Sequence, residues 1–267
     1  MHPNSKPNPE IQKRWSYKGR LLNYLPKKLA STYIQMKFLY FIFLSIFLFT
    51  SPSSQSKSEY LKDLKLELQT KWPENRTINL VFHGHSVPAG YFKTPIVNTL
   101  ASYPYLVLQE LKTQYPYAVI NVINTSIGGE DSKSGEKRFE SDVLSHRPDV
   151  LFIDYALNDR RIGLDSAKVA WESMIQLALA KDIKIILLTP SPDKKLDLKE
   201  NDTVLDEHSN QIRQLSEKYE IGLVDSYKLF KKEIGSGADL DNFMSQGNHP
   251  NEKGHALIAN GILDYFN

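Results

Sequence analysis

Residues 77–90, TINLVFHGHSVPAG, decide the fold of this chain. The first part, 77–83, is a short apolar run that predicts a buried β-strand, and a turn containing Gly84 follows it at once. Similar apolar runs recur along the chain, and each predicts a further strand: 118–123, 149–155, 183–189 and 221–225.

The segments around these strands repeat their apolar residues at intervals of three and four, which predicts amphipathic helices. The expected helices are 57–74, 95–113, 134–146, 165–181, 203–219 and 251–265. Five strands that alternate with helices form a parallel sheet covered on both faces. Because crossover connections are right-handed, the sequence predicts a single α/β domain over 57–267, a three-layer α/β/α sandwich with a five-stranded parallel sheet.

Composition excludes several classes of protein. The chain has 267 residues, 41% of them hydrophobic and 24% charged, which is typical of a globular protein. It has no cysteine, so a disulfide framework, a thiolate metal site, a Cys nucleophile and a lipidated cysteine are excluded. The first 37 residues hold eight of the 33 Lys and Arg and one of the 31 Asp and Glu. The rest of the chain is therefore mildly acidic, which argues against a nucleic-acid partner.

The basic N-terminal segment is followed by FLYFIFLSIFLF at 38–49, which carries no charge. As a helix these residues would extend roughly 18 Å, short of the ~30 Å hydrocarbon core of a membrane. This length favours the apolar part of a signal peptide. We therefore expect residues 1–56 to be a basic leader with a signal peptide, whose true start could be Met36, and the body to be exported to the periplasm or outside the cell. If the segment is not cleaved, it would anchor the protein to a membrane.

Four polar blocks follow predicted strands or precede the last helix, where a parallel sheet gathers its ligand-binding loops. A serine, a glycine-rich turn, an asparagine and a histidine at one edge are what acyl transfer requires. Ser86 is the candidate nucleophile and His249 the base that activates it. The backbone N–H groups of Ser86 and Gly129 and the side-chain amide of Asn158 are candidates for the oxyanion hole. Residues 91–94, just after the serine, could shape the pocket.

The order and spacing of these blocks resemble the SGNH, or GDSL-type, hydrolases, and the resemblance covers about 77–267. The matching residues are Gly84-His85-Ser86, Asn124 to Gly129, Ala156-Leu157-Asn158-Asp159 and His249-Pro250-Asn251. The resemblance implies a flavodoxin-like sandwich and a secreted serine esterase that needs no cofactor and no metal. It also implies small acyl esters as substrates, such as O-acetyl groups on carbohydrates.

The sequence departs from the family pattern at three positions. His85 replaces an Asp, Ala156 replaces a Gly, and Gln246 stands where the family usually has an Asp three residues before its His. That Asp orients the imidazole and stabilises its protonated form. Either Gln246 accepts the Nδ1–H of the histidine through its oxygen, or another carboxylate reaches the ring. The candidate carboxylates are Asp241, Asp225 and Asp154.

Two other functions stay open from the sequence. The missing Asp would suit a non-catalytic glycan-binding protein on the same fold. Alternatively, His83 and His85 could hold a metal, since alternation along a strand puts both rings on one face. Against the metal, a metal-dependent barrel needs about eight strand–helix units, and five are predicted here. We therefore expect His85, together with Asn248, to line the pocket.

Overall fold

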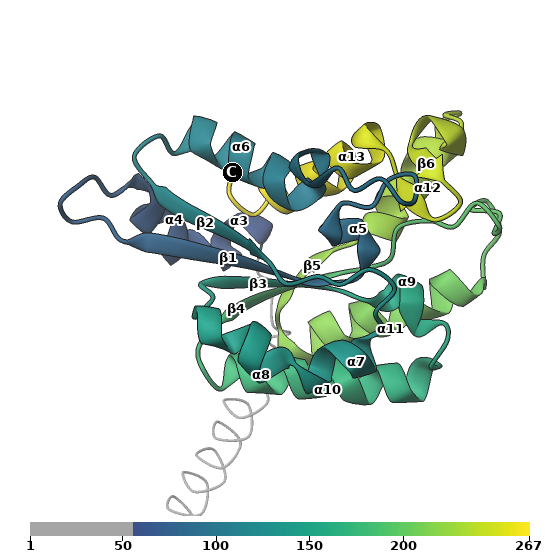
Figure 1. Cartoon of the computed structure of the whole chain (residues 1–267), viewed down its shortest axis with the longest axis horizontal. Helices are drawn as coiled ribbons and strands as arrows, with labels where there is room; N and C mark the ends of the chain where they lie inside the picture. The colour runs from purple at the N-terminus through teal and green to yellow at the C-terminus, as the bar shows by residue number, and fades with distance from the viewer. Residues whose placement is uncertain (1–55) are drawn as a thin grey trace, which may run out of the picture. The chain divides into compact units, whose positions relative to one another are not determined.

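Five parallel strands form the central sheet, in the order β2-β1-β3-β4-β5 (Figure 1). This is the order of a flavodoxin-like sheet, so the predicted fold is confirmed. Each of the five predicted apolar runs forms one strand. The strands are β1 (Thr77–Gly84), β2 (Val119–Asn124), β3 (Val150–Asp154), β4 (Lys184–Leu188) and β5 (Gly222–Val224).

The structure is a computed structural model that describes residues 56–267. The expected leader, with its apolar segment 38–49, lies outside these residues except for Ser56. Among the described residues, no helix is both long and apolar enough to cross a membrane.

Helices cover both faces of the sheet and make it the middle layer (Figure 1). On β3, Phe152 packs into one core with Tyr103, while its neighbour Leu151 packs into the other core with Trp171. This alternation follows from the twofold period of a strand. The first core is covered by α3 (Lys57–Tyr60), α4 (Lys62–Gln69), α6 (Tyr103–Gln114), α12 (Ser226–Gly235) and α13 (Glu252–Leu263). The second is covered by α7 (Ser132–Lys137), α8 (Phe139–Asp142), α10 (Leu164–Leu179) and α11 (Val204–Tyr219).

Several predicted boundaries were wrong. The helix expected from 95 begins only at Tyr103, with Pro104 in its first turn, and residues 95–102 form a loop with a short 3-10 turn, η2 (Thr99–Ala101). Leu100, in this loop, is 70% exposed. The helix expected over 134–146 is broken into α7, α8 and a further 3-10 turn, η3 (Leu144–His146).

Two parts of the fold were not predicted from the sequence: α12 and a small antiparallel pair, β6 (Met244–Gln246) and β7 (His249–Pro250). Strands of three and two residues are too short to show an alternating pattern. This pair carries one of the predicted site residues, His249, to the edge of the main sheet.

Candidate active site

The turn after β1 is held so closely that its backbone leaves no room for a side chain at Gly84. A Cβ there would lie 2.4 Å from the carbonyl oxygen of Asp154 and 2.8 Å from Cγ of Pro88. The next residue, His85, donates its backbone N–H to the same carbonyl at 3.2 Å and caps the short helix α5 (Ser86–Ala89). Ser86 is thereby fixed at the carboxyl end of β1, an inner strand of the sheet, where this fold binds its ligands.

The sheet edge brings Ser86 together with His249, which is 163 residues further along the chain. Ser86 Oγ lies 2.9 Å from His249 Nε2, and both residues are buried. This distance allows an imidazole to take the proton of a serine hydroxyl.

The other ring nitrogen, Nδ1 of His249, has two close neighbours. The carbonyl oxygen of Phe92 lies 3.0 Å away and Nε2 of Gln246 lies 2.6 Å away. Gln246 turns its oxygen to the backbone N–H of Thr94 at 3.0 Å. The expectation that Gln246 accepts from Nδ1 through its oxygen is therefore wrong. The acceptor that faces Nδ1 is the carbonyl of Phe92.

The three carboxylates considered as alternatives have other partners. Asp241 pairs with Lys194, Asp225 pairs with Arg213, and Asp154 accepts from the hydroxyl of Tyr103. Within residues 56–267, no carboxylate makes a hydrogen bond to His249. These three predicted alternatives are therefore not brought to the histidine.

The surroundings of His249 favour its neutral form. Burial lowers the pKa of its imidazole, the carbonyl of Phe92 acts in the opposite direction, and the nearby ring of His85 lowers it again. A neutral imidazole can act as a general base, so the site keeps a usable base below the ordinary histidine pKa of about 6.5.

The loops after β2 and β3 carry the predicted oxyanion donors. Ile127 N–H donates to the carbonyl of Gly84 at 3.0 Å, which ties the loop after β2 to the end of β1. Gly129 adopts a φ of +81°, a conformation that suits glycine. Asn158, in α9 (Ala156–Asp159), donates its amide to the carbonyl of Glu130 at 2.9 Å. In the described part of the chain the backbone N–H groups of Ser86 and Gly129 have no acceptor, so they remain available to a ligand.

The structure corrects the expectation that His85 lines the pocket. Its side chain is fully buried. Its Nδ1 accepts from the backbone N–H of Val87 at 3.2 Å, and its Nε2 lies 3.3 Å from a carboxylate oxygen of Asp154. This last contact is not aligned as a hydrogen bond. His85 thus supports the serine turn from within the core, whereas Asn248 is half-buried in the turn before His249.

His83 and His85 do not share a ligand-binding face. His83 contacts the hydroxyl of Thr125 and the carbonyl of Gly135, and burial lowers its pKa to about 3. Among the residues that the structure describes, no cluster of three or more His, Cys, Asp or Glu could hold a metal ion.

A chain of buried contacts runs beneath the site from the serine side to the histidine side. The hydroxyl of Tyr103 donates to Asp154 at 3.0 Å, and its backbone N–H donates to Nδ1 of His255 at 3.2 Å. The ring of His255 stacks on Phe92 at 4.9 Å, and the carbonyl of Phe92 faces His249. No sequence pattern indicates the part played by Phe92, because every residue has a backbone carbonyl.

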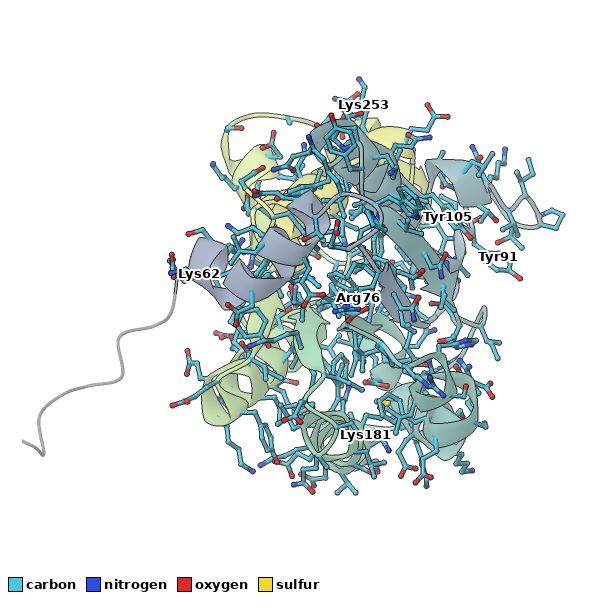
Figure 2. The ribbon with its side chains drawn as sticks, turned by 90° about the vertical axis from the view of Figure 1, so that its left-hand side faces the viewer. Lys62, Arg76, Tyr91, Tyr105, Lys181 and Lys253 are labelled. Atoms are coloured by element: carbon cyan, nitrogen blue, oxygen red, sulfur yellow. The ribbon has the colours of Figure 1, made fainter. Side chains whose placement is uncertain are left out.

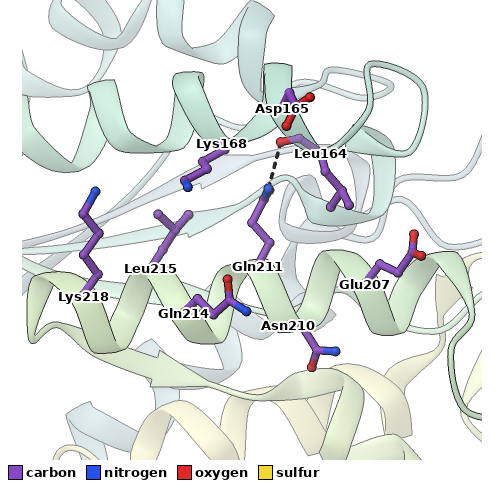
Figure 3. A pocket seen from close by; sticks show the side chains of 9 residues that line it. All are labelled: Leu164, Asp165, Lys168, Glu207, Asn210, Gln211, Gln214, Leu215 and Lys218. Atoms are coloured by element: carbon purple, nitrogen blue, oxygen red, sulfur yellow. Dashed lines mark hydrogen bonds between the residues drawn. The ribbon is translucent and has the colours of Figure 1, made fainter.

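A groove of about 460 Å3 lies apart from this site, between α10 and α11 (Figure 3). Gln211 crosses it and donates to the carbonyl of Leu164 at 2.8 Å. None of its residues belongs to the loops that carry Ser86 or His249. The lining residues are Leu164, Asp165, Lys168, Glu207, Asn210, Gln211, Gln214, Leu215 and Lys218.

Fold and site together define a carboxylic ester hydrolase of the α/β/α sandwich type. Residues 82–257 match the model of the GDSL-like lipase/acylhydrolase family, and the chain belongs to this family.

Two curated proteins are similar to more than half of this chain. An acetylxylan esterase from Geobacillus stearothermophilus is 22% identical over 165 residues, which cover 57% of this chain and 75% of that protein. An uncharacterized lipoprotein, YqeF, from Bacillus subtilis (strain 168) is 24% identical over 177 residues, 54% of this chain and 73% of that protein.

Solved structures share the fold. The acetylxylan esterase Axe2 from Geobacillus stearothermophilus superposes with a TM-score of 0.62 at 23% identity, over 71% of this chain and 94% of that one. A two-domain esterase active on acetylated mannans gives a TM-score of 0.65 at 20% identity, over 80% of this chain and 54% of that one. Catalytic mutants of Axe2 have been solved in which a serine, a histidine or an aspartate is replaced by alanine.

Proposed function

We propose that the protein is a serine esterase that removes small acyl groups, chiefly O-acetyl, from carbohydrates. Ser86 is the nucleophile and His249 the general base. The observation that carries this proposal is the 2.9 Å contact between Ser86 Oγ and His249 Nε2 at the ligand-binding edge of the sheet.

The reaction has two halves. In the first, Ser86 Oγ attacks the ester carbonyl carbon while its proton passes to His249 Nε2, and the carbon–oxygen bond to the alcohol breaks as that proton is delivered to the alcohol oxygen. In the second, His249 takes a proton from water, the hydroxide attacks the acyl-enzyme, and Ser86 Oγ leaves with the proton as the acid is released. Both tetrahedral intermediates carry a negative oxygen. The N–H groups of Ser86 and Gly129 and the amide of Asn158 are the proposed donors to it.

The orientation of His249 in this proposal comes from the backbone. A carbonyl only accepts hydrogen bonds, so the contact with Phe92 requires a proton on Nδ1. This tautomer leaves the lone pair of Nε2 directed at Ser86, as a base needs. The amide nitrogen of Gln246 is also a donor, so it opposes this tautomer and supplies no negative charge. The absence of the family's Asp therefore removes a negative charge but leaves the imidazole ring oriented. The presence of Gln246 at this position does not require a non-catalytic role for the protein.

The substrate class and the location rest on similarity and sequence. An acetylxylan esterase and an esterase active on acetylated mannans are among the similar proteins, which supports an O-acetylated polysaccharide or oligosaccharide as the substrate. The apolar segment 38–49 and the name of the lipoprotein relative support export, where such polymers are found. The chain lacks the cysteine that lipidation would require.

The test is turnover of p-nitrophenyl acetate and of acetylated xylooligosaccharides by the full chain. Ser86→Ala should lower kcat/KM by at least ~10³-fold, because the nucleophile is lost. The exposed Ser58 provides a matched control, and Ser58→Ala should leave the rate unchanged. Treatment with EDTA should have no effect. Activity that survives Ser86→Ala but is lost in EDTA would contradict the serine mechanism in favour of a metal-dependent one.

A further inference from the structure

We propose that the ring of Tyr91 closes the acyl side of the site and restricts the enzyme to short acyl groups. This inference rests on the proposed function and adds to it the residue that sets the acyl length. Tyr91 lies in the loop that follows the serine helix and is labelled in Figure 2.

The backbone of Tyr91 is attached to the nucleophile itself. Its N–H donates to the carbonyl of Ser86 at 3.0 Å, directly after Gly90 ends α5 in a left-handed conformation with φ of +92°. On the other side, Tyr91 forms an antiparallel bridge with Val97. These contacts fix where the side chain leaves the backbone relative to Ser86.

The ring of Tyr91 lies near the base, His249, and packs on Gly128 in the loop that carries the proposed oxyanion donor. Its centroid lies 6.0 Å from that of the His249 imidazole. On another side it packs so closely on Gly128 that a Cβ at that position would lie 2.9 Å from Cε2 and Cζ of the ring. Gly128 precedes Gly129, the proposed oxyanion donor. Tyr91 therefore fills the space between the base and the oxyanion loop.

This placement limits what the reacting carbon can carry. In the tetrahedral intermediate the oxyanion faces Gly129 and the alcohol oxygen faces His249, which must protonate it. The acyl group takes the remaining direction, and a chain longer than acetyl meets the aromatic ring. The hydroxyl of Tyr91 has no hydrogen bond within residues 56–267, so the ring, and not the hydroxyl, forms the wall.

Beyond the ring lies apolar surface that a longer acyl chain could use. Ile127, next to Gly128, is 49% exposed, and Val97, paired with Tyr91, is 45% exposed. Removing the ring would connect the serine to these side chains. A variant without the ring should therefore gain activity on longer esters as well as lose selectivity for acetate.

The experiment compares kcat/KM for p-nitrophenyl acetate, butyrate and hexanoate in four forms of the full chain. Wild type should prefer acetate. Tyr91→Ala should raise the ratio of hexanoate to acetate at least ~10-fold, the usual scale of discrimination by an apolar wall. Tyr91→Phe keeps the ring and should keep the wild-type ratio. Tyr117→Ala removes an exposed tyrosine just before β2, at the opposite end of the strands, and should also leave it unchanged.

A second pair of variants tests whether the ring of Tyr91 packs on Gly128. Gly128→Ala should lower kcat/KM for acetate, since the new methyl group collides with the ring, and the same change should be tolerated in the Tyr91→Ala background. An unchanged ratio in Tyr91→Ala, or an equal loss on all three esters with the protein still folded, would overturn the role of Tyr91. If wild type neither turns over these esters nor is labelled at Ser86 by a p-nitrophenyl alkylphosphonate, the proposed function itself fails.

Discussion

The serine and the histidine of this site are held in different ways. Ser86 follows β1, an inner strand of the sheet, at a turn where even a Cβ on Gly84 would collide with backbone. His249 lies on β7, a strand of two residues outside the main sheet, and its Nδ1 faces the carbonyl of Phe92, in a loop, with the amide of Gln246 on β6 beside it. The nucleophile is therefore positioned by the core of the fold, and the base by uncharged groups near the surface.

This difference indicates which side of the site tolerates change. A buried backbone contact has no alternative arrangement, because interiors are packed as densely as crystals. A contact made by a loop can be replaced by a contact from another residue that places a hydrogen-bond acceptor at the same position. The histidine side can therefore lose the family's carboxylate and keep its geometry, while the serine side cannot lose a glycine.

The largest effect is expected from Gly84→Ala, which adds a methyl group where the turn that carries Ser86 has no room for one. The added Cβ would lie 2.4 Å from the carbonyl oxygen of Asp154, so β1 and β3 must separate. We expect a loss of about 3 kcal/mol or more in the free energy of unfolding, measured by urea denaturation.

Gly235 supplies the matched control for that change. It lies at the end of α12, and a Cβ there meets no atom within 4 Å. Gly235→Ala should leave stability unchanged or raise it by up to about 1 kcal/mol. Equal effects at Gly84 and Gly235 would contradict the close packing of the serine turn.

Low pH should destabilise the folded protein, because a histidine is buried on the serine side of the site and another on the histidine side. Burial lowers the pKa of His83, on the serine side, and of His255, on the histidine side, to about 3. Below the unfolded value near 6.5, the unfolded chain binds protons that the folded chain does not, so stability falls as the pH falls. At pH 5 each histidine should cost about 2 kcal/mol. Asp159, whose pKa burial raises to about 6, should offset about 1 kcal/mol, since it binds its proton more readily when folded.

Urea denaturation at pH 7.5 and pH 5 measures this effect. His255→Asn keeps an acceptor for the backbone N–H of Tyr103 and removes the titrating ring, so it should reduce the acid-induced loss by about 2 kcal/mol, roughly two thirds of the total. Stability that is equal at both pH values would show that these histidines are protonated in the folded protein.

Gln246→Asp restores the negative charge on the histidine side. A carboxylate facing Nδ1 stabilises the protonated imidazole that forms during attack, so kcat/KM for p-nitrophenyl acetate should rise about tenfold. Gln246→Ala leaves the carbonyl of Phe92 in place and should change the rate by less than about threefold. A loss of more than ~100-fold in Gln246→Ala would assign the orientation of His249 to the amide instead.

The parts of the molecule that sequence patterns describe well are the buried ones. The inner strands β1, β3 and β4 were predicted because a strand buried on both faces is an uninterrupted apolar run. Ser86 and His249 were predicted as partners because the blocks that contain them occur in a specific order. The contact between them is 2.9 Å.

What the sequence could not predict depends on backbone and tertiary contacts. No pattern distinguishes the carbonyl of Phe92 from that of any other residue, and β7 is too short to be recognised. His85 was expected in the pocket because it adjoins Ser86, yet its ring is fully buried and accepts from the backbone N–H of Val87 as the cap of α5. Gln246 could be predicted as a neighbour of His249, but which end of its amide faces the ring is decided by Thr94.

The most direct test of this account is the pH dependence of kcat/KM for p-nitrophenyl acetate in wild type and Gln246→Asp. The central claim is that His249 acts as a buried base with no carboxylate at Nδ1. Burial then lowers the pKa of His249, so the wild-type rate should fall to half at a pH below 6.5, because only the neutral imidazole accepts the serine proton. In Gln246→Asp the half-point should move to higher pH, since a negative charge favours the protonated ring. A wild-type half-point above 6.5, unmoved by the substitution, would contradict the claim and indicate that a carboxylate already faces His249.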